Sequence, residues 1–383
     1  MWVKRLEVRD FRSYEAAELD FTPGAVVLVG PNGQGKTNLV EAIAYCSALD
    51  SHRVHGDTAL VRTGAPSAVV RTTAVTAGRE TTVELMLNPG RSNRVQINGQ
   101  AVARNRDVVG TIRCAVFAPE HLRLVKGDPA DRRRFLDSVM VQVAPRYLSV
   151  RSDFERALKQ RNAALRSLVS APSREAEGVL AAWDERYVPI AVELTWGRTN
   201  AVRQLAAVVA ESYRQISPQD DTVAVAYEAS AAPGEATSEW DSREGLSESV
   251  AQALRDHRRD ELRRGVTLVG PHRDDLALLL NGQPARTFAS HGEAWSLALA
   301  LQLASFQVLH RIADDPPILI LDDVFAELDE QRRERLLDAV TAAEQIIVTA
   351  AVAADVPQRL AAQRFDVRKI DGRSHVTPVA SDG

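Results

Sequence analysis

A short apolar run leads directly into a glycine-rich turn near the start of the chain. Residues 25–29 predict a buried strand, and the pattern that follows predicts a helix over 37–49. Glycines let backbone N–H groups converge on phosphate oxygens, and the start of a helix adds positive potential. We therefore expect a nucleotide triphosphate site in which Lys36 reaches the β- and γ-phosphates and Thr37 binds Mg²⁺. The turn fits G-x-x-x-x-G-K-S/T and consists of Gly30, Pro31, Asn32, Gly33, Gln34, Gly35, Lys36 and Thr37, followed by Asn38.

Two acidic residues follow a second apolar run near the other end of the chain. Residues 318–321 are Ile-Leu-Ile-Leu and predict a buried parallel strand, and Asp322 and Asp323 come directly after it. The carboxyl ends of parallel strands meet ligands at one edge of a sheet. We expect Asp322 to join Thr37 around Mg²⁺ and Asp323 to act as general base for the attacking water.

Most of the 383 residues lie between these two motifs. Simple P-loop enzymes keep the two motifs much closer, so the chain ends must fold together and the middle must project as an insertion. This is the arrangement of ABC-type and SMC-like ATPases. We predict an α/β fold in which an ABC-type P-loop ATPase head is formed by residues 1–118 plus 265–383. Residues 119–264 are expected to form an inserted, mostly helical arm.

The hydropathy pattern also predicts the coarse elements. Residues 68–117 predict a β meander with a hairpin turn at Asn98-Gly99, and Thr111–Phe117 closes it. From Pro119 to about Ser217 the pattern is helical, with interruptions at Pro145, Pro172 and Pro189. The other expected elements are strands over 3–8, 17–21, 222–227, from 266, and over 345–349, a polar loop from 228 to 247, a second hairpin at 281–282, and helices over 247–264, 294–312 and 331–343.

Composition excludes several classes of protein. The net charge of −4 excludes a protein whose whole surface is basic and binds nucleic acid, but it does not exclude local basic patches. Two cysteines, Cys46 and Cys114, predict no disulfide framework and fit a reducing compartment. No apolar run is long enough to span a membrane, and the N-terminal residues lack the apolar segment of a secretory signal. We expect a cytoplasmic protein.

A serine motif opens the apolar helix that precedes the carboxylate strand. Ser290 and Glu293 fit S-x-x-E, which is typical of a capping box. A helix start with a small serine and a glycine also suits a phosphate. In ABC-type heads a motif at this position contacts the nucleotide held by a second copy. Both interpretations stay open, and on the second one Ser290, Gly292 and Glu293 bind nucleotide, so that ATP joins two heads until hydrolysis releases them.

These motifs together resemble the RecF family of SMC-like ATPases, which lack a long coiled coil. The resemblance extends over nearly the whole chain and is weakest over 145–260. The matching segments are GQGKTNLVEAI from Gly33, Ser51–Arg53, Leu60–Arg62, Phe117–Leu122, Leu124–Gly127, Arg132–Asp137, Gly270–Leu276, the Ser290 motif, and LDDVFAELD from Leu321.

The resemblance implies a weak, DNA-stimulated ATPase whose ATP-dependent homodimer binds DNA. The expected DNA is gapped or has a junction of single and double strands, and little base specificity is expected. The resemblance also implies work with RecO and RecR to promote RecA loading in gap repair and the SOS response. The segment Ala326–Asp329 also resembles the D-loop of ABC-type ATPases, which lies at the dimer interface.

Several positions depart from the family pattern. Glu293 stands where glutamine is common, and Trp295 stands where a basic residue is common. Glu120 takes the place of a Q-loop glutamine, and Thr349 occupies the neighbourhood of the switch histidine of ABC transporters. The sequence assigns no role to Glu120, His272 or Trp295.

Candidate DNA contacts come from arginine clusters. Arg53, with His52 beside it, and the run Arg132, Arg133 and Arg134 are the first candidates. Two further groups lie over 151–166 and 255–264. Acidic residues are interspersed in each group, so a solvated face with i,i+4 ion pairs is the alternative interpretation.

Other functional classes share the nucleotide residues. A nucleotide-switched structural DNA clamp has the same ATP site without a mediator role. An ABC transporter subunit is disfavoured by the missing switch histidine, and an SMC-related nuclease accessory head would need a long coiled coil.

Overall fold

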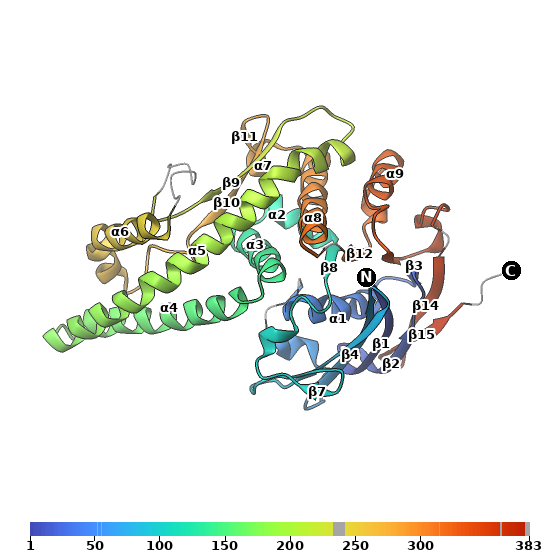
Figure 1. Cartoon of the computed structure of the whole chain (residues 1–383), viewed down its shortest axis with the longest axis horizontal. Helices are drawn as coiled ribbons and strands as arrows, with labels where there is room; N and C mark the ends of the chain where they lie inside the picture. The colour runs from blue at the N-terminus through green and yellow to red at the C-terminus, as the bar shows by residue number, and fades with distance from the viewer. Residues whose placement is uncertain (52, 55, 233–241, 314, 361, 380–383) are drawn as a thin grey trace. The chain divides into compact units, whose positions relative to one another are not determined.

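The computed structural model describes residues 1–51, 53–54, 56–232, 242–313, 315–360 and 362–379 of the chain (Figure 1). They form two compact units. The first, which we call the head, comprises Met1–Val125, Val208–Thr222 and Ala289–Gly383. The second, which we call the arm, comprises Lys126–Ala207 and Val223–Phe288. The units differ from the expected division mainly because residues 265–288 group with the arm and residues 208–222 with the head.

A six-stranded, mostly parallel sheet forms the centre of the head. Its order is β15-β14-β3-β13-β12-β8, with an antiparallel pairing only at the β14–β15 edge. Strand β13 lies between β3 and β12, so the two predicted motifs sit at the same sheet edge, one strand apart. The bounds are β3 (Gly24–Val29), β8 (Cys114–Phe117), β12 (Ile318–Asp322), β13 (Gln345–Ala350), β14 (Ala362–Ile370) and β15 (Arg373–Pro378).

Strand β8 corrects the sequence prediction. We expected Thr111–Phe117 to close the β meander, and this was wrong because β8 pairs in parallel with β12. The run Cys-Ala-Val-Phe has no polar alternation, and the strand is largely buried. A short continuous apolar run of this kind fits the interior of a parallel sheet.

The second sheet of the head is antiparallel and six-stranded, with the order β2-β1-β4-β5-β6-β7. The hairpin predicted at Asn98-Gly99 is confirmed: it joins β6 to β7, and both residues have positive φ, 50° and 78°. The bounds are β1 (Trp2–Phe11), β2 (Tyr14–Asp20), β4 (Ala68–Thr76), β5 (Arg79–Leu87), β6 (Arg94–Ile97) and β7 (Gln100–Ala101).

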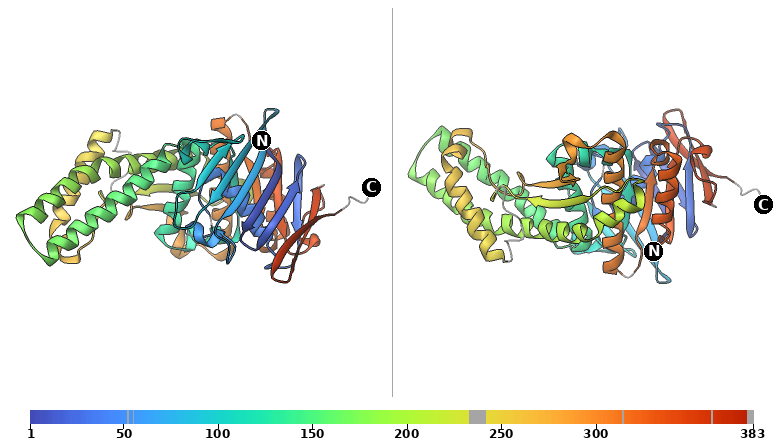
Figure 2. Two further views of the ribbon diagram at one scale, coloured as in Figure 1. Left: turned by 90° about the horizontal axis from the view of Figure 1, so that it is seen from below. Right: turned by 90° about the horizontal axis from the view of Figure 1, so that it is seen from above.

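Helices complete the layers of the head (Figure 2). Helix α1 (Lys36–Ala48) contacts strands of both sheets and lies between them. On the other face of the parallel sheet, α8 (His291–Ala313) and α9 (Glu330–Ala339) pack on a large apolar cluster, which includes Phe117, Leu299, Leu319, Leu321, Phe306 and Leu336. The helices predicted over 37–49, 294–312 and 331–343 are therefore present. Helix α8 begins three residues earlier than expected, and α9 ends four residues earlier.

The arm is mostly helical, as expected, and also contains a small sheet with the order β11-β10-β9. The predicted hairpin at 281–282 joins β10 to β11. Helix α2 (Leu122–Lys126) ends at the first residue of the arm, and the last turns of α5 belong to the head. The other bounds are α3 (Pro129–Val143), α4 (Tyr147–Ser170), α5 (Arg174–Ile216), α6 (Arg243–Arg264), α7 (Ala285–Phe288), β9 (Val223–Glu228), β10 (Asp275–Leu280) and β11 (Gln283–Pro284).

Three details of the arm differ from the sequence prediction. Pro145 and Pro172 follow helix ends as expected, but Pro189 lies inside α5. An internal proline costs a helix about 3 kcal/mol, and burial of Tyr187, Ala191 and Val192 on either side of it offsets that cost. The strand expected from Val266 begins only at β10. Helix α6 begins four residues earlier than predicted because Ser242 caps it, with Oγ accepting from Gly245 N. Residues 233–241 of the predicted loop lie outside the described residues.

Within the described residues, no helix has both the length and the apolar character needed to cross a bilayer. Cys46 and Cys114 are buried free thiols.

A fully buried guanidinium holds the helices of the arm together. Arg161 on α4 is 0% exposed and donates to Asp184 on α5, at 2.7 Å, and to both carboxylate oxygens of Glu261 on α6. Its Nη1 also donates to Thr267 Oγ1 at 2.8 Å. Arg161 therefore lies in the interior of the arm. It is neither a DNA contact nor part of a solvated face, the two interpretations that the sequence offered for the group over 151–166.

Arg161→Met is expected to destabilise the arm by about 3–5 kcal/mol, because Glu261 would keep a buried charge without its cation. The matched control on the same helix is Arg156→Met, since Arg156 is 76% exposed and, within the described part of the chain, pairs only with Asp153; its effect is expected to stay within about 0.5 kcal/mol. Urea unfolding followed by circular dichroism measures both. Equal losses for the two variants would contradict the structural role of Arg161.

Candidate nucleotide site

The glycine-rich loop connects the end of β3 to the start of α1. Gly33 and Gly35 have φ values of 80° and 111°, a region that residues with a Cβ rarely adopt. At Gly30 a Cβ would lie 2.1 Å from the carbonyl oxygen of Val367. Glycine is therefore favoured at these three positions, at Gly33 and Gly35 by the backbone conformation and at Gly30 by the close approach of Val367.

Lys36 is buried against its own loop. Its Nζ donates to the carbonyl oxygens of Gly30, at 2.6 Å, and Pro31, at 3.2 Å. Burial lowers the pKa of Lys36, and the nearby carboxylates of Asp323 and Asp322 act in the opposite direction. The ammonium is thus held beside two acids at the mouth of the loop.

Both ends of the chain support this loop. Tyr14 on β2 donates its hydroxyl to Gly35 O at 3.2 Å, and Asn38 Nδ2 donates to Ser13 Oγ at 2.8 Å. Gln34 Oε1 accepts from the backbone N–H of Lys369 on β14 at 2.6 Å. The predicted joining of the two chain ends is therefore visible in the contacts of the loop itself.

Asp322 connects three elements of the head. Its Oδ1 accepts from Thr37 Oγ1 on α1 at 3.0 Å and from Thr349 Oγ1 on β13 at 2.6 Å. Burial raises the pKa of Asp322 to about 6, and the two threonine hydrogen bonds act against this rise. The structure brings Thr37 and Asp322 together, and their expected role around Mg²⁺ stays a prediction.

Thr349 is the residue that sequence reasoning missed. Besides donating to Asp322, its Oγ1 accepts from the backbone N–H of Asp323 at 2.9 Å. The sequence analysis noted only that Thr349 lies near the position of the ABC switch histidine, at the end of an apolar run, and β-pairing was needed to put that run between β3 and β12.

Asp323 has an unusual backbone and an unsatisfied side chain. Its φ is 55°, in the left-handed region that non-glycine residues seldom occupy. Its Oδ1 is buried and has no hydrogen-bond partner among the described residues. Strained, unpartnered groups concentrate at sites of function. Asp323 therefore has two features that are typical of a functional residue.

Arg53 and Glu120 lie close to this edge. Arg53 Nε is 3.4 Å from Glu120 Oε1, and its Nη1 is 3.7 Å from Glu41 Oε2. Glu41 on α1 is fully buried and is held mainly by a bidentate contact from Arg12, at 2.6 and 2.8 Å. The charges of Glu120 and Arg53 act on the pKa of Asp322 in opposite directions. Both residues therefore belong to the electrostatic surroundings of the site; His52 lies outside the described residues.

The capping box at Ser290 is confirmed. Ser290 N donates to Glu293 Oε2 at 2.6 Å, and Glu293 N donates to Ser290 Oγ at 3.3 Å. Ser290 is exposed, whereas Trp295 is buried in the apolar cluster, and its Nε1 has no partner in the part of the chain that the structure describes. In the described part of the chain, no hydrogen bond joins Ser290, Gly292 or Glu293 to the loop over 30–37. Nucleotide binding by these three residues stays a prediction.

Two arginines of the run on α3 are bound to acidic residues of the arm. Arg132 is 5% exposed and forms two 2.7 Å hydrogen bonds with the carboxylate of Asp275. Arg133 donates to the carbonyl oxygen of Asp274 at 2.9 Å, and Arg134 is half-buried. These contacts explain Arg132 and Arg133 as structural residues, and we do not keep them as DNA contacts.

The segment around His272, which the sequence left without a role, is also structural. His272 Nε2 is 3.0 Å from Thr267 O, and its Nδ1 is 3.4 Å from the hydroxyl of Tyr187. Burial lowers the pKa of His272 to about 4. Asp274 accepts from Tyr227 and from Ser230. This segment therefore organises the arm.

Asp322→Asn is expected to raise the free energy of unfolding of the nucleotide-free protein at pH 7.5, by up to about 3 kcal/mol. The pKa of Asp322 is raised by folding, so its contribution to stability is complete below the pKa of an unfolded aspartate and is lost as pH rises through about 6. Thermal unfolding between pH 4.5 and 7.5 should therefore show the advantage of the variant growing with pH. If Asp322→Asn is less stable than the wild type at pH 7.5, the buried carboxylate of Asp322 does not destabilise the fold and the prediction is wrong.

Comparisons with known proteins agree with this geometry. The model of the RecF/RecN/SMC N-terminal domain matches residues 2–367. The DNA replication and repair protein RecF of Kineococcus radiotolerans is 47% identical over 393 residues, covering 100% of this chain and 99% of the relative. RecF of Streptomyces avermitilis is 47% identical over 371 residues, covering 96% and 98%.

A solved structure has the same fold over its full length. It is the recombination mediator protein RecF with ATPrS, described as part of the RecFOR pathway, with a TM-score of 0.87, 26% sequence identity, and coverage of 99% of this chain and 98% of that one. A second structure of RecF with ATP matches equally well. The α/β head is thus an ABC-type P-loop ATPase head, and the chain belongs to the RecF family of SMC-like ATPases.

Proposed function

We propose that this protein is an ATP-dependent, DNA-binding recombination mediator. Its head binds ATP with Mg²⁺, two copies associate around the nucleotide, and slow hydrolysis separates them. The observation that supports this most strongly is the pair formed by Asp322, hydrogen-bonded to Thr37 and Thr349, and Asp323, whose Oδ1 is buried without a partner.

The residues present fit a magnesium-bound triphosphate. The glycines of the loop allow the positive φ values seen at Gly33 and Gly35, and Lys36 already lies on that loop with two carbonyl partners that a phosphate can replace. Thr37 and Asp322 would hold Mg²⁺, which supplies positive charge to the phosphate oxygens. Asp323 would accept a proton from the attacking water, because its Oδ1 has no competing partner.

We assign Ser290, Gly292 and Glu293 to the nucleotide of a second copy. The capping box fixes the start of α8 while leaving Ser290 exposed, so its hydroxyl and the first turn of the helix are accessible from outside the head. A fixed helix start of this kind attracts phosphate oxygens. In this arrangement each dimer would contain two nucleotides between the heads.

The mediator role rests on the family. The solved RecF structure is described as a recombination mediator in the RecFOR pathway, and that description supports work with RecO and RecR here. We propose that the dimer binds gapped DNA or strand junctions in the cytoplasm, that DNA stimulates hydrolysis, and that RecA loading in gap repair and the SOS response follows.

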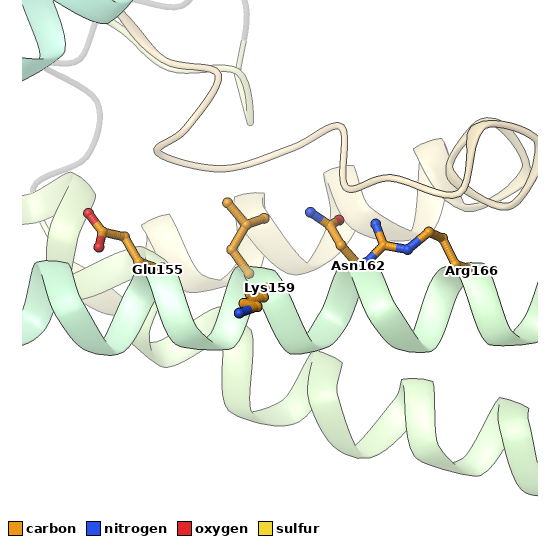
Figure 3. A pocket seen from close by; sticks show the side chains of 5 residues that line it. Glu155, Lys159, Asn162 and Arg166 are labelled. Atoms are coloured by element: carbon orange, nitrogen blue, oxygen red, sulfur yellow. The ribbon is translucent and has the colours of Figure 1, made fainter. Parts of the chain in front are cut away.

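We further propose that the arm contributes to DNA binding through α4. Glu155, Leu158, Lys159, Asn162 and Arg166 line an open groove of about 330 Å³, and Figure 3 shows four of them projecting from α4. Lys159 and Arg166 are exposed, and neither has an ion-pair partner among the described residues. By contrast, Arg156, Arg258 and Arg263 pair with Asp153, Asp184 and Asp260. Two unpaired cations on one side of a helix suit phosphates.

Asp323→Asn is expected to bind ATP and accumulate as a dimer, because the proton acceptor is lost while the residues that hold the triphosphate remain. Light scattering with and without Mg-ATP measures the dimer. Adding Ser290→Arg as the matched variant should return it to monomer, since a bulky cation blocks the start of α8. An Asp323→Asn protein that hydrolyses ATP at the wild-type rate would exclude Asp323 as the general base.

Replacing both Lys159 and Arg166 with alanine is expected to weaken binding of gapped duplex DNA in the presence of ATP. Each lost phosphate contact lowers the slope of log K against log salt by about 0.9, so the double variant should lose one to two units of slope. Arg156→Ala is the control, because its ion pair with Asp153 already neutralises it. An unchanged slope in the double variant would remove the α4 groove from the DNA-binding surface.

A further inference from the structure

We infer that Arg332 is a positioning residue that joins the Ser290 helix start to the segment that follows the catalytic carboxylates. This inference rests on the proposed function, because it concerns how one copy presents Ser290 to the nucleotide of another. Arg332 lies in the first turn of α9, and it contacts both helix starts that the proposed dimer would use.

The contacts of Arg332 to α8 are specific. Its Nε donates to Ser296 Oγ at 3.1 Å, and Ser296 is fully buried. The guanidinium also rests on Gly292, where an added Cβ would lie 3.1 Å from Nη2. Glycine at this position thus admits the guanidinium to the first turn of α8, two residues after Ser290.

The other contacts of Arg332 fix the start of α9. Asp329 caps this helix, with Oδ1 accepting from Arg332 N at 2.8 Å, and its Oδ2 accepts from Arg332 Nη1. Asp329 ends the short segment that begins directly after Asp323 and passes through the 3₁₀ turn Phe325–Glu327. The arginine is only 18% exposed.

Apolar packing supports the same connection. Trp295, next to Ser296, lies in one buried cluster with Val324, Phe325 and Leu328. The start of α8 and the segment over 324–329 therefore share both an apolar contact and a charged one. A displacement of the segment after Asp323 would be transmitted to Ser290 through Arg332.

A guanidinium suits this task better than an ammonium. It presents several N–H groups in a rigid plane, so Nε can bind Ser296 while Nη1 binds Asp329. A lysine carries the same charge on a single nitrogen without that fixed fork. Charge alone and the fork geometry can thus be separated by substitution.

The test uses the full-length protein carrying Asp323→Asn, with ATP-dependent dimerisation measured by light scattering. Arg332→Ala and Ser296→Ala are each expected to weaken dimerisation about tenfold or more, the range expected for losing a hydrogen bond to a charged group. In the background with Asp323 intact, the same variants should lower kcat. Binding of a fluorescent ATP analogue by the monomer should stay within about twofold, since the loop over 30–37 is untouched.

Arg332→Lys should behave like Arg332→Ala, and restored dimerisation by lysine would overturn the positioning role. Arg359→Ala is the matched control. Arg359 is exposed and pairs with Glu334 and Asp338, which lie on α9 as Arg332 does. Within the described residues it forms no ion pair with α8. If Ser290→Arg abolishes dimerisation while Arg332→Ala and Ser296→Ala dimerise normally, only the inference fails. If Ser290→Arg also dimerises normally, the proposed function fails.

Discussion

The carboxylate of Asp322 is the point on which the head depends. Its Oδ1 accepts hydrogen bonds from the hydroxyl of Thr37 on α1 and from the hydroxyl of Thr349 on β13. This single oxygen at the end of β12 therefore joins α1, from the first part of the chain, to two strands from the last part. The carboxylate is buried, and its pKa is raised to about 6 as a result. The folded head therefore contains a buried carboxylate whose charged form lowers stability at neutral pH.

Other buried charges in the chain are balanced internally. Glu41 is matched by Arg12, Arg161 by Glu261 and Asp184, and Arg198 by Asp137. These pairs have good geometry and several hydrogen bonds each, which is the condition under which buried ions persist. Within the described residues, the buried Oδ1 of Asp323 has no such partner, and the same holds for Oε2 of Glu120 and Oδ2 of Asp315. Of these three oxygens, that of Asp323 belongs to the residue that directly follows Asp322.

Local sequence patterns predicted much of the site. Four features depend on residues that are close in sequence, so a local pattern was enough to predict them. They are the loop over 30–37, the helix after it, the strand before Asp322 and the capping box at Ser290. Thr349 could not be predicted in its role, because its function depends on β13 pairing between two other strands. For the same reason β8 was assigned to the wrong sheet: its apolar run fits a buried parallel strand, but its pairing with β12 depends on a segment about 200 residues away.

The sequence by itself determined that the chain has a phosphate loop near one end, a carboxylate pair near the other, and an insertion between them. The tertiary structure decided which arginines are available at the surface. Sequence spacing treats Arg132, Arg161 and Arg166 alike, yet Arg132 and Arg161 are buried in ion pairs whereas Arg166 is exposed. The difference is physical: a guanidinium enters the interior only where a carboxylate from a distant part of the chain meets it, and only folding brings such a carboxylate near.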